Sequence, residues 1–357
     1  EEIKATLMKD LREIGSEEER KAQDKYIRRT GMLISKLKNR DFKMKIILSS
    51  CDLFFAGEEF SRYGEQNPNV INFGNGVIEL WGTKAFFRTG KPEDYLEISN
   101  SLVYDPHLSW ENKHVKRLME WLRRVYPDPE VLNFWLKYSA SRLRGRNSDK
   151  IFAIFTGTGN NSKSMIMRLY ECTFEDRCIK VQVTYLTNPR TSSSGPSPEV
   201  ARMAGARIVT ADEPGPGNII LAENIKQDVS NDKHFARFLN ENGRDFIFTH
   251  GLVLLCNAVP AIPNADKATK NRFTKIPHVS EWSEDAPSDE AEQLRRNVYP
   301  IDNYFEDSIQ ELAPAFAWVL VHYYTRYIYE GMIKPKALKV SISDYWYKID
   351  PYKRFID

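Results

Sequence analysis

The chain has 357 residues, of which 41% are hydrophobic, and a formal net charge of +2. This content is sufficient for two or three domains with hydrophobic cores and excludes a disordered protein. The balanced charge does not decide whether nucleic acid is bound, because binding depends on where positive side chains gather. No run of 18 apolar residues and no signal-peptide pattern occurs, so we expect an intracellular, soluble protein without a membrane partner.

The start of the chain and the cysteines lead to further expectations. The sequence begins with Glu1 inside a charged helical pattern, which suggests a piece of a longer polypeptide. Its four cysteines form no C-x-x-C pair, so a zinc site is not expected and a reducing compartment is favoured. Cys256, in an apolar run, is expected to be a small buried hydrophobic residue.

Residues 1–45 predict two amphipathic helices. Leu7, Leu11 and Ile14 form one apolar stripe, and Met32, Leu33 and Leu37 form a second. Nine lysines and arginines between residues 21 and 45 favour a solvated helix face, with a nucleic-acid contact as the alternative. We assign residues 1–70 to a helical N-terminal collar or linker.

Short strands and then helices are expected before residue 150. Residues 68–105 predict strands and turns, with a hairpin at the pair Asn75 and Gly76. Residues 111–143 predict helices whose apolar stripes belong to the core. A basic cluster follows, made of Arg142, Arg144, Arg146 and Lys150.

A strand, a loop and a helix are predicted next, and they form the centre of the candidate site. The apolar run 151–156 predicts a buried strand, and the run 165–170 predicts a helix. The loop between them fits the phosphate-binding pattern G-x-x-x-x-G-K-[ST], except that Ser162 replaces the second glycine. Its residues are Gly157, Thr158, Gly159, Asn160, Asn161, Ser162, Lys163 and Ser164. Backbone N–H groups of such a loop bind phosphates, Lys163 reaches the β- and γ-phosphates, and Ser164 holds Mg²⁺. The alternative is a loop that only joins a strand to a helix.

Two carboxylates follow the apolar run 206–211. Asp212 and Glu213 would lie at the carboxyl edge of a parallel sheet, where ligands bind. Asp212 can then hold the metal while Glu213 activates the attacking water. An acidic turn after a core strand is the alternative.

The next segments add an amide, an arginine and a basic hairpin. Residues 235–239 and 244–249 predict strands that flank an Asn-Gly turn, and the candidate DNA contacts there are Lys233, His234, Arg237 and Arg244. Asn257 ends the apolar strand 252–256, where it can orient water or sense the γ-phosphate. Arg272 precedes another apolar strand, 273–277.

The remaining chain predicts a loop and a helix. Residues 281–300 are acidic and contain proline and serine, which indicates a loop. A helix is expected over 307–330, and the spacing of its aromatic residues favours packing over base stacking. These are Trp318, Tyr323, Tyr324, Tyr327 and Tyr329.

The order of these parts resembles the superfamily 3 helicases, a viral and plasmid branch of the AAA+ ATPases. The primase-helicase family of poxviruses, other large DNA viruses and phages is the most similar. The segments that carry the resemblance are 72–80, 157–164, 206–213, 226–232 with Arg237, Asn257-x-x-Pro260, Arg272 and 345–356. Ser162 departs from the family pattern, and no primase acid cluster can be assigned within residues 1–70.

The resemblance implies a homo-hexameric ring that hydrolyses ATP with Mg²⁺ at subunit interfaces and moves 3′ to 5′ on one DNA strand. By this carry-over, Lys163 and Ser164 bind phosphate and Mg²⁺, Asp212 and Glu213 are the acids, and Asn257 is the sensor. Arg272 resembles an arginine finger acting in trans, and the basic hairpin is the DNA grip. The implied partners are single-stranded DNA, a forked duplex, a linked or associated primase and a replicative polymerase, and the implied location is the host cytoplasm or a viral replication site.

We therefore expect an α/β fold with an AAA+ parallel-sheet ATPase core. The expected domains are a pre-helicase domain over 71–148, the core over 149–280 and a helical domain over 281–357. Two alternatives remain: an AAA+ ATPase that remodels protein or serves uncoating without unwinding, and a DNA-binding assembly module with a vestigial loop.

Overall fold

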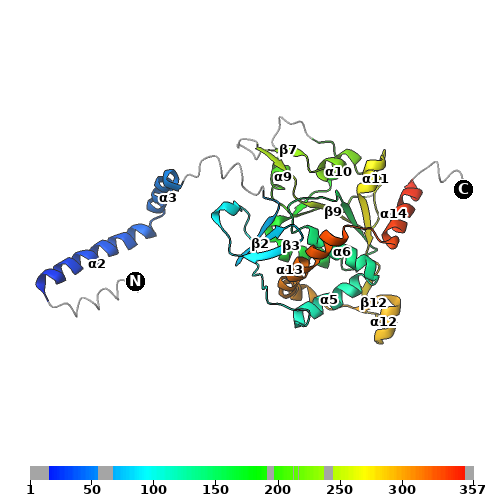
Figure 1. Ribbon diagram of the computed structural model, residues 1–357, viewed down its shortest axis with the longest axis horizontal. Helices are drawn as coiled ribbons and strands as arrows, with labels where there is room; N and C mark the ends of the chain where they lie inside the picture. Colours follow the sequence, from blue (N-terminus) through cyan, green and yellow to red (C-terminus); the bar gives the residue numbers. More distant parts are fainter. Residues whose placement is uncertain are drawn as a thin grey trace. The chain divides into compact units, whose positions relative to one another are not determined.

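The computed structural model describes residues 16–54, 67–190, 197–211, 213–215, 217–236 and 244–349 (Figure 1). The chain divides into two compact units, Glu1–Arg62 and Tyr63–Asp357. Within the described ranges, no helix has the length and apolar character needed to cross a membrane. The predicted boundaries near residues 148 and 280 both fall inside the second unit.

The first unit contains the helices α2 (Glu17–Lys38) and α3 (Arg40–Phe54). The predicted helix around the second apolar stripe is therefore present. Met32 and Leu33 are nevertheless 59% and 54% exposed, so this stripe is not buried by the unit's own residues. The stripe from Leu7 to Ile14 lies outside the described residues.

A five-stranded parallel sheet organises the second unit, and this confirms the predicted α/β class. The strands are β4 (Phe152–Thr156), β5 (Cys178–Val181), β6 (Ile208–Ala211), β9 (Gly251–Cys256) and β10 (Phe273–Pro277). They pair in the order β10-β4-β9-β6-β5. Since all the pairs are parallel, the carboxyl ends of β4, β9 and β6 meet at one edge.

Helices cover both faces of this sheet. Ala153 and Phe155 of β4 point into a core shared with α5 (Lys113–Val125), α6 (Pro129–Ser141), α7 (Lys163–Phe174) and α13 (Phe305–Glu330). Phe152 and Ile154 point into the opposite core, which includes α10 (Ala222–Asp228) and Tyr345 of α14 (Lys336–Ile349). The strand is buried on both faces, as its unbroken apolar run predicts.

Short elements complete the second unit. They are η1 (Pro92–Asp94), η2 (Glu175–Arg177), α8 (Thr184–Thr187), α9 (Pro198–Ala201), β7 (Lys233–Ala236), β8 (Arg244–Ile247), α11 (Lys267–Arg272), β11 (Glu281–Ser283), α12 (Glu290–Arg296) and β12 (Val298–Pro300). The loop predicted over 281–300 is wrong in part, because β11 and β12 pair in parallel and α12 lies between them. The packing role of the aromatic residues of α13 is confirmed for Trp318, Tyr324 and Tyr327, which are buried, whereas Tyr329 is exposed.

A three-stranded antiparallel sheet precedes α5. Its strands are β1 (Val70–Phe73), β2 (Gly76–Trp81) and β3 (Lys84–Arg88). The predicted hairpin exists, but Phe73 pairs with Gly76, so the two turn residues are Gly74 and Asn75. Both glycines are closely packed, since a Cβ would lie 2.5 Å from the carbonyl oxygen of Ser101 at Gly74 and 2.5 Å from that of Arg88 at Gly76.

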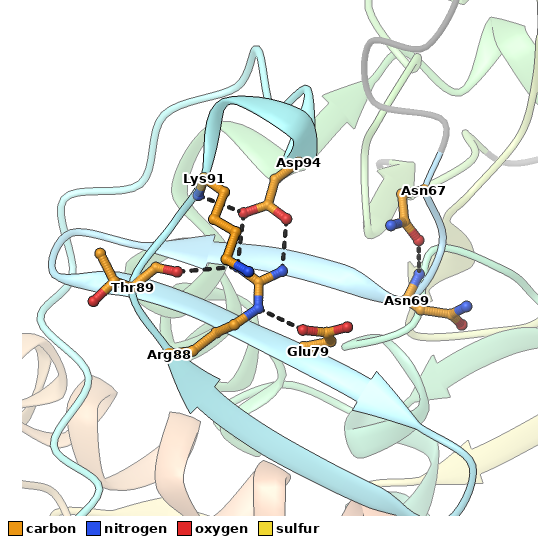
Figure 2. Close-up of polar contacts among 7 residues, drawn as sticks. All are labelled: Asn67, Asn69, Glu79, Arg88, Thr89, Lys91 and Asp94. Carbon is orange, nitrogen blue, oxygen red and sulfur yellow. Dashed lines mark hydrogen bonds and ion pairs between the residues drawn. The ribbon is translucent and has the colours of Figure 1, made fainter.

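Arg88 ties this small sheet to the segment that follows it (Figure 2). Its guanidinium pairs with Glu79 on β2 and donates to both carboxylate oxygens of Asp94, at 2.9 Å and 2.6 Å. Asp94 also accepts from the backbone N–H of Lys91 at 2.8 Å. The hydrogen bonds from Arg88 lower the pKa of Asp94, because they stabilise its charged form.

We predict that Asp94→Ala lowers the free energy of unfolding by about 1–3 kcal/mol, because Arg88 would lose a partner in a partly buried site. Urea unfolding at pH 7 measures this loss. Glu93→Ala is the matched control, because Glu93 is the exposed neighbour in the same turn. Since the folded pKa of Asp94 is lowered, its contribution is complete above the unfolded value and disappears as pH falls through the folded one. Equal unfolding free energies for the two variants at pH 7 would contradict this assignment.

Candidate functional site

The predicted phosphate loop joins β4 to α7 at the carboxyl edge of the sheet. Its backbone takes positive φ at Gly159 (113°), Asn160 (43°) and Ser162 (60°). Ser162 therefore adopts the left-handed conformation that glycine adopts most easily. Serine replaces glycine at this position, and the backbone still makes the left-handed turn at the start of α7.

The segment after β10 lies against this loop. The backbone N–H of His278 donates to the carbonyl of Thr156 at 2.7 Å, and that of Trp282 donates to the carbonyl of Asn160 at 2.8 Å. Gly157 is packed so closely that a Cβ there would lie 1.9 Å from Asn161 Nδ2 and 2.8 Å from the carbonyl oxygen of His278. Only glycine fits this position without a shift of the loop.

Three predicted site residues are joined by hydrogen bonds. Lys163 Nζ donates to the carbonyl of Gly157 at 2.7 Å, to Asn161 Oδ1 at 3.0 Å and to Asn257 Oδ1 at 3.2 Å. Asn257 donates to both carboxylate oxygens of Glu213, through its backbone N–H at 2.8 Å and its Nδ2 at 3.2 Å. Burial lowers the pKa of Lys163, and the nearby Glu213 charge raises it. The amine, amide and carboxylate thus meet beside the loop, as the parallel register requires.

A cavity of about 930 Å³ opens beside these side chains. One wall is the loop with the ends of β6 and β9, and the other is formed by α5 and the segment 300–306. The second wall includes Arg117, Trp121 and Phe305. A cavity of this size can hold a whole nucleotide.

The residues present fit a bound phosphate chain with Mg²⁺. The loop presents the start of α7, whose dipole favours anions, and Lys163 supplies the cation. Asn161 Nδ2 is buried and has no hydrogen-bond partner among the described residues, so an acceptor oxygen could satisfy it. Ser164 lines the cavity and can hold Mg²⁺. Asp212, predicted as the second metal ligand, lies outside the described residues.

Arg272 lies away from this group. It ends α11, and the next residue, Phe273, pairs with Phe152 at the start of β4. The loop begins one strand length further, about 13 Å along the sheet. Arg272 donates to the carbonyl of Ala268 at 3.0 Å. The structure therefore does not bring Arg272 to the phosphate loop of its own chain.

The predicted hairpin is present as β7 paired with β8, with Ala236 opposite Arg244. It leads through residues 248–250 into the amino end of β9, so it lies at the sheet edge opposite the phosphate loop. Lys233 is exposed, while the ring of His234 packs 3.9 Å from that of Phe248. Burial lowers the pKa of His234, which weakens the case for a charged DNA contact there. Arg237 and the Asn-Gly turn lie outside the described residues, and only the backbone of Arg244 is described.

Local sequence patterns do not identify the residues that contact the loop or those across the cavity. His278 follows the predicted strand 273–277, Trp282 lies in the predicted loop 281–300, and Trp121 comes from a helix assigned to the core. None belongs to a local motif. The only signal was the position of His278 directly after an apolar strand.

The chain is similar in sequence to viral proteins that are named as helicases and primases. It is 32% identical over 284 residues to "Putative helicase 121R" of Invertebrate iridescent virus 3, covering 77% of this chain and 30% of that protein. It is 29% identical over 327 residues to "Putative helicase L207/L206" of Acanthamoeba polyphaga mimivirus, covering 91% and 34%. It is 22% identical over 303 residues to "Putative primase C962R" of African swine fever virus (isolate Tick/Malawi/Lil 20-1/1983), covering 84% and 31%. The chain thus spans about a third of the length of these relatives, and no protein-family model matches it.

Among solved structures, the apo C-terminal region of NrS-1 covers 75% of this chain and 69% of its own, with 13% identity and a TM-score of 0.46. The similarity to known proteins rests on the sequence relatives. They confirm the predicted likeness to helicases of large DNA viruses, and the assignment to superfamily 3 stays a prediction.

We predict that Gly157→Ala lowers the free energy of unfolding by about 1–3 kcal/mol, because the added methyl group overlaps Asn161 and the backbone of His278. Thermal or urea unfolding measures the change. Gly90→Ala is the matched control, because a Cβ there meets only a Val77 methyl group at 3.6 Å. Equal stability of the two variants would show that the loop is not packed as described.

Proposed function

We propose that this chain is the motor part of an ATP-driven DNA helicase that serves viral DNA replication. One observation carries the proposal: Lys163, Asn257 and Glu213 are linked by hydrogen bonds beside a loop of phosphate-binding form. The similarity to proteins named as viral helicases supports DNA as the substrate.

Each of the linked side chains has its own role in ATP hydrolysis. Backbone N–H groups of the loop hold the phosphates, and Lys163 exchanges its bonds to the loop and Asn257 for phosphate oxygens. Glu213, released from Asn257, accepts a proton from the attacking water as the bond to the γ-phosphorus forms and the bond to the leaving ADP oxygen breaks. Asn257 keeps the water in line. Mg²⁺, when bound, would neutralise phosphate charge, and Ser164 with Asp212 would hold it.

The position of Arg272 favours a ring in which subunits complete one another's sites. Lys226 pairs at 2.8 Å with Asp266, the N-cap of α11, and so fixes the helix that ends at Arg272. In this proposal Arg272 stabilises charge at the phosphates of a neighbouring copy. We propose a closed ring, because it gives every site the same neighbour, and we propose six subunits because the resemblance to superfamily 3 helicases implies a homo-hexamer.

The β7–β8 hairpin is the proposed DNA contact. Lys233 and Phe235 lie on one face of β7, and Phe235 is 52% exposed. A lysine with an exposed ring suits a single strand, since the cation attracts phosphate and the ring stacks on a base of any sequence. Arg237 and Arg244 would add charge, whereas His234 supports the hairpin from its packed face. We also propose that the chain moves 3′ to 5′ along DNA and that it works with a linked primase and a polymerase.

We predict that Lys163→Ala and Glu213→Gln each reduce ATP hydrolysis by about 10²-fold or more, because one removes the phosphate cation and the other the base. Steady-state hydrolysis with and without single-stranded DNA, and strand displacement on tailed forks, measure the effect. Lys84→Ala is the matched control, because Lys84 is exposed on β3 away from the cavity. Full hydrolysis by Lys163→Ala would refute the site, and hydrolysis without strand displacement would favour a remodelling ATPase.

We predict that Arg272→Ala subunits, inactive alone, regain hydrolysis when mixed with Lys163→Ala subunits. A site is complete where the intact loop of an Arg272→Ala subunit faces the intact arginine of a Lys163→Ala neighbour, whereas the reverse order lacks both groups. Such an arginine contributes about 10³- to 10⁵-fold to turnover. The matched control mixes Arg272→Ala with a Lys163→Ala, Arg272→Ala double variant, which supplies no arginine and should restore nothing. Lack of recovery in the first mixture would argue against action in trans.

A further inference from the structure

His278 connects the phosphate loop to the helical layer through its side chain as well as its backbone. Its Nδ1 lies 3.2 Å from the carbonyl oxygen of Asn161, and its Nε2 lies 3.2 Å from the hydroxyl of Tyr126 at the end of α5. The three residues are 4%, 5% and 2% exposed, so solvent does not compete for these hydrogen bonds. No local motif contains this chain of contacts.

The partners fix the tautomer of the imidazole. A carbonyl oxygen can only accept, so Nδ1 must carry the proton that it donates to Asn161. Burial lowers the pKa of His278 to about 3, so the ring is neutral and Nε2 has a free lone pair. Tyr126 must therefore donate its hydroxyl proton to Nε2. The direction of every hydrogen bond in the chain follows from this assignment.

These contacts set the orientation of two consecutive peptide planes. His278 holds the carbonyl of Asn161, and the backbone N–H of Trp282 holds the carbonyl of Asn160. In a trans peptide the N–H of the next residue points opposite to the carbonyl, and no cis peptide occurs among the described residues. The N–H groups of Asn161 and Ser162 are thus turned away from the segment that holds the carbonyls. Successive N–H groups turned together form an anion-binding nest.

We propose that His278, oriented by Tyr126, is the positioning residue that presents the phosphate loop's N–H groups to a nucleoside triphosphate. The proposal rests on the proposed function, because it concerns the same site. His278 does not line the cavity, so it acts through the loop and touches no substrate. Ser280 supports the segment by donating to the carbonyl of Arg124 at 2.5 Å.

Two amide substitutions separate positioning from packing. In His278→Asn the side-chain amide takes the place of Nδ1 and can still donate to Asn161, while in His278→Gln it takes the place of Nε2. We expect His278→Gln to weaken binding of a non-hydrolysable ATP analogue with Mg²⁺ about tenfold, which corresponds to one lost hydrogen bond. We expect His278→Asn to stay within about threefold of the unsubstituted chain.

The measurements use the full 357-residue chain and titration calorimetry. His250→Asn is the matched control, because His250 is also fully buried and its pKa is lowered to about 3. His250 lies at the opposite sheet edge, so its substitution should leave nucleotide affinity unchanged.

Nitrogen-15 spectra of labelled histidine, assigned through His278→Asn, should show the Nδ1–H tautomer at pH 7. Tyr126→Phe should weaken this tautomer preference while leaving the ring buried.

The outcomes separate this proposal from the proposed function. An unsubstituted chain that binds no nucleotide would refute both. Nucleotide binding that is equal in the His278→Asn and His278→Gln variants, or an Nε2–H tautomer, would overturn only the role of His278. Weaker binding in His278→Gln alone, together with the Nδ1–H tautomer, is the result that supports it.

Discussion

The parallel pairing of β4 with β9 and of β9 with β6 is the constraint on which the site depends. Thr156 lies opposite Cys256, and Ala211 lies opposite Leu254, so the residues that follow these strands meet at one edge. Lys163, Asn257 and Glu213 are far apart in sequence and come within hydrogen-bonding distance for this reason. A shift of one residue in either pairing would turn inward-facing side chains to the other face and separate the three groups.

The sequence predicts those parts of the site that rest on local patterns. An unbroken apolar run, a glycine-rich loop and a lysine identify β4 and the start of α7, and Glu213 and Asn257 follow because each ends an apolar strand. Local patterns predict the β1–β2 turn one residue late and predict a loop over 281–300, where β11, α12 and β12 lie. The close approach of Gly74 to Ser101 and the pairing of β11 with β12 both join residues fifteen or more positions apart, which no local pattern records.

Ser162 illustrates how tertiary packing can compensate for an unfavourable local residue. A left-handed serine costs roughly 1 kcal/mol relative to glycine. The carbonyls of Asn160 and Asn161, which precede Ser162, accept hydrogen bonds from Trp282 and His278, and Lys163 donates to the carbonyl of Gly157. The hydrogen bonds from Trp282 and His278 thus hold the loop backbone from outside the motif, and that from Lys163 holds it from within. The loop therefore requires the left-handed backbone conformation at this position, and glycine is the usual residue that provides it.

The supporting residues also show how far the site extends beyond the strands that carry its chemistry. Tyr126 precedes β4, and Phe305 follows β12, yet one orients the loop through His278 and the other lines the cavity. A fragment limited to residues 149–280 would keep Lys163, Asn257 and Glu213 but lose both of these side chains. It would also expose the face of β4 formed by Ala153 and Phe155, which packs against the core of α5, α6 and α13. The helices on that face are therefore part of the machinery that shapes the phosphate loop, because they cover the sheet and hold His278 in its tautomer.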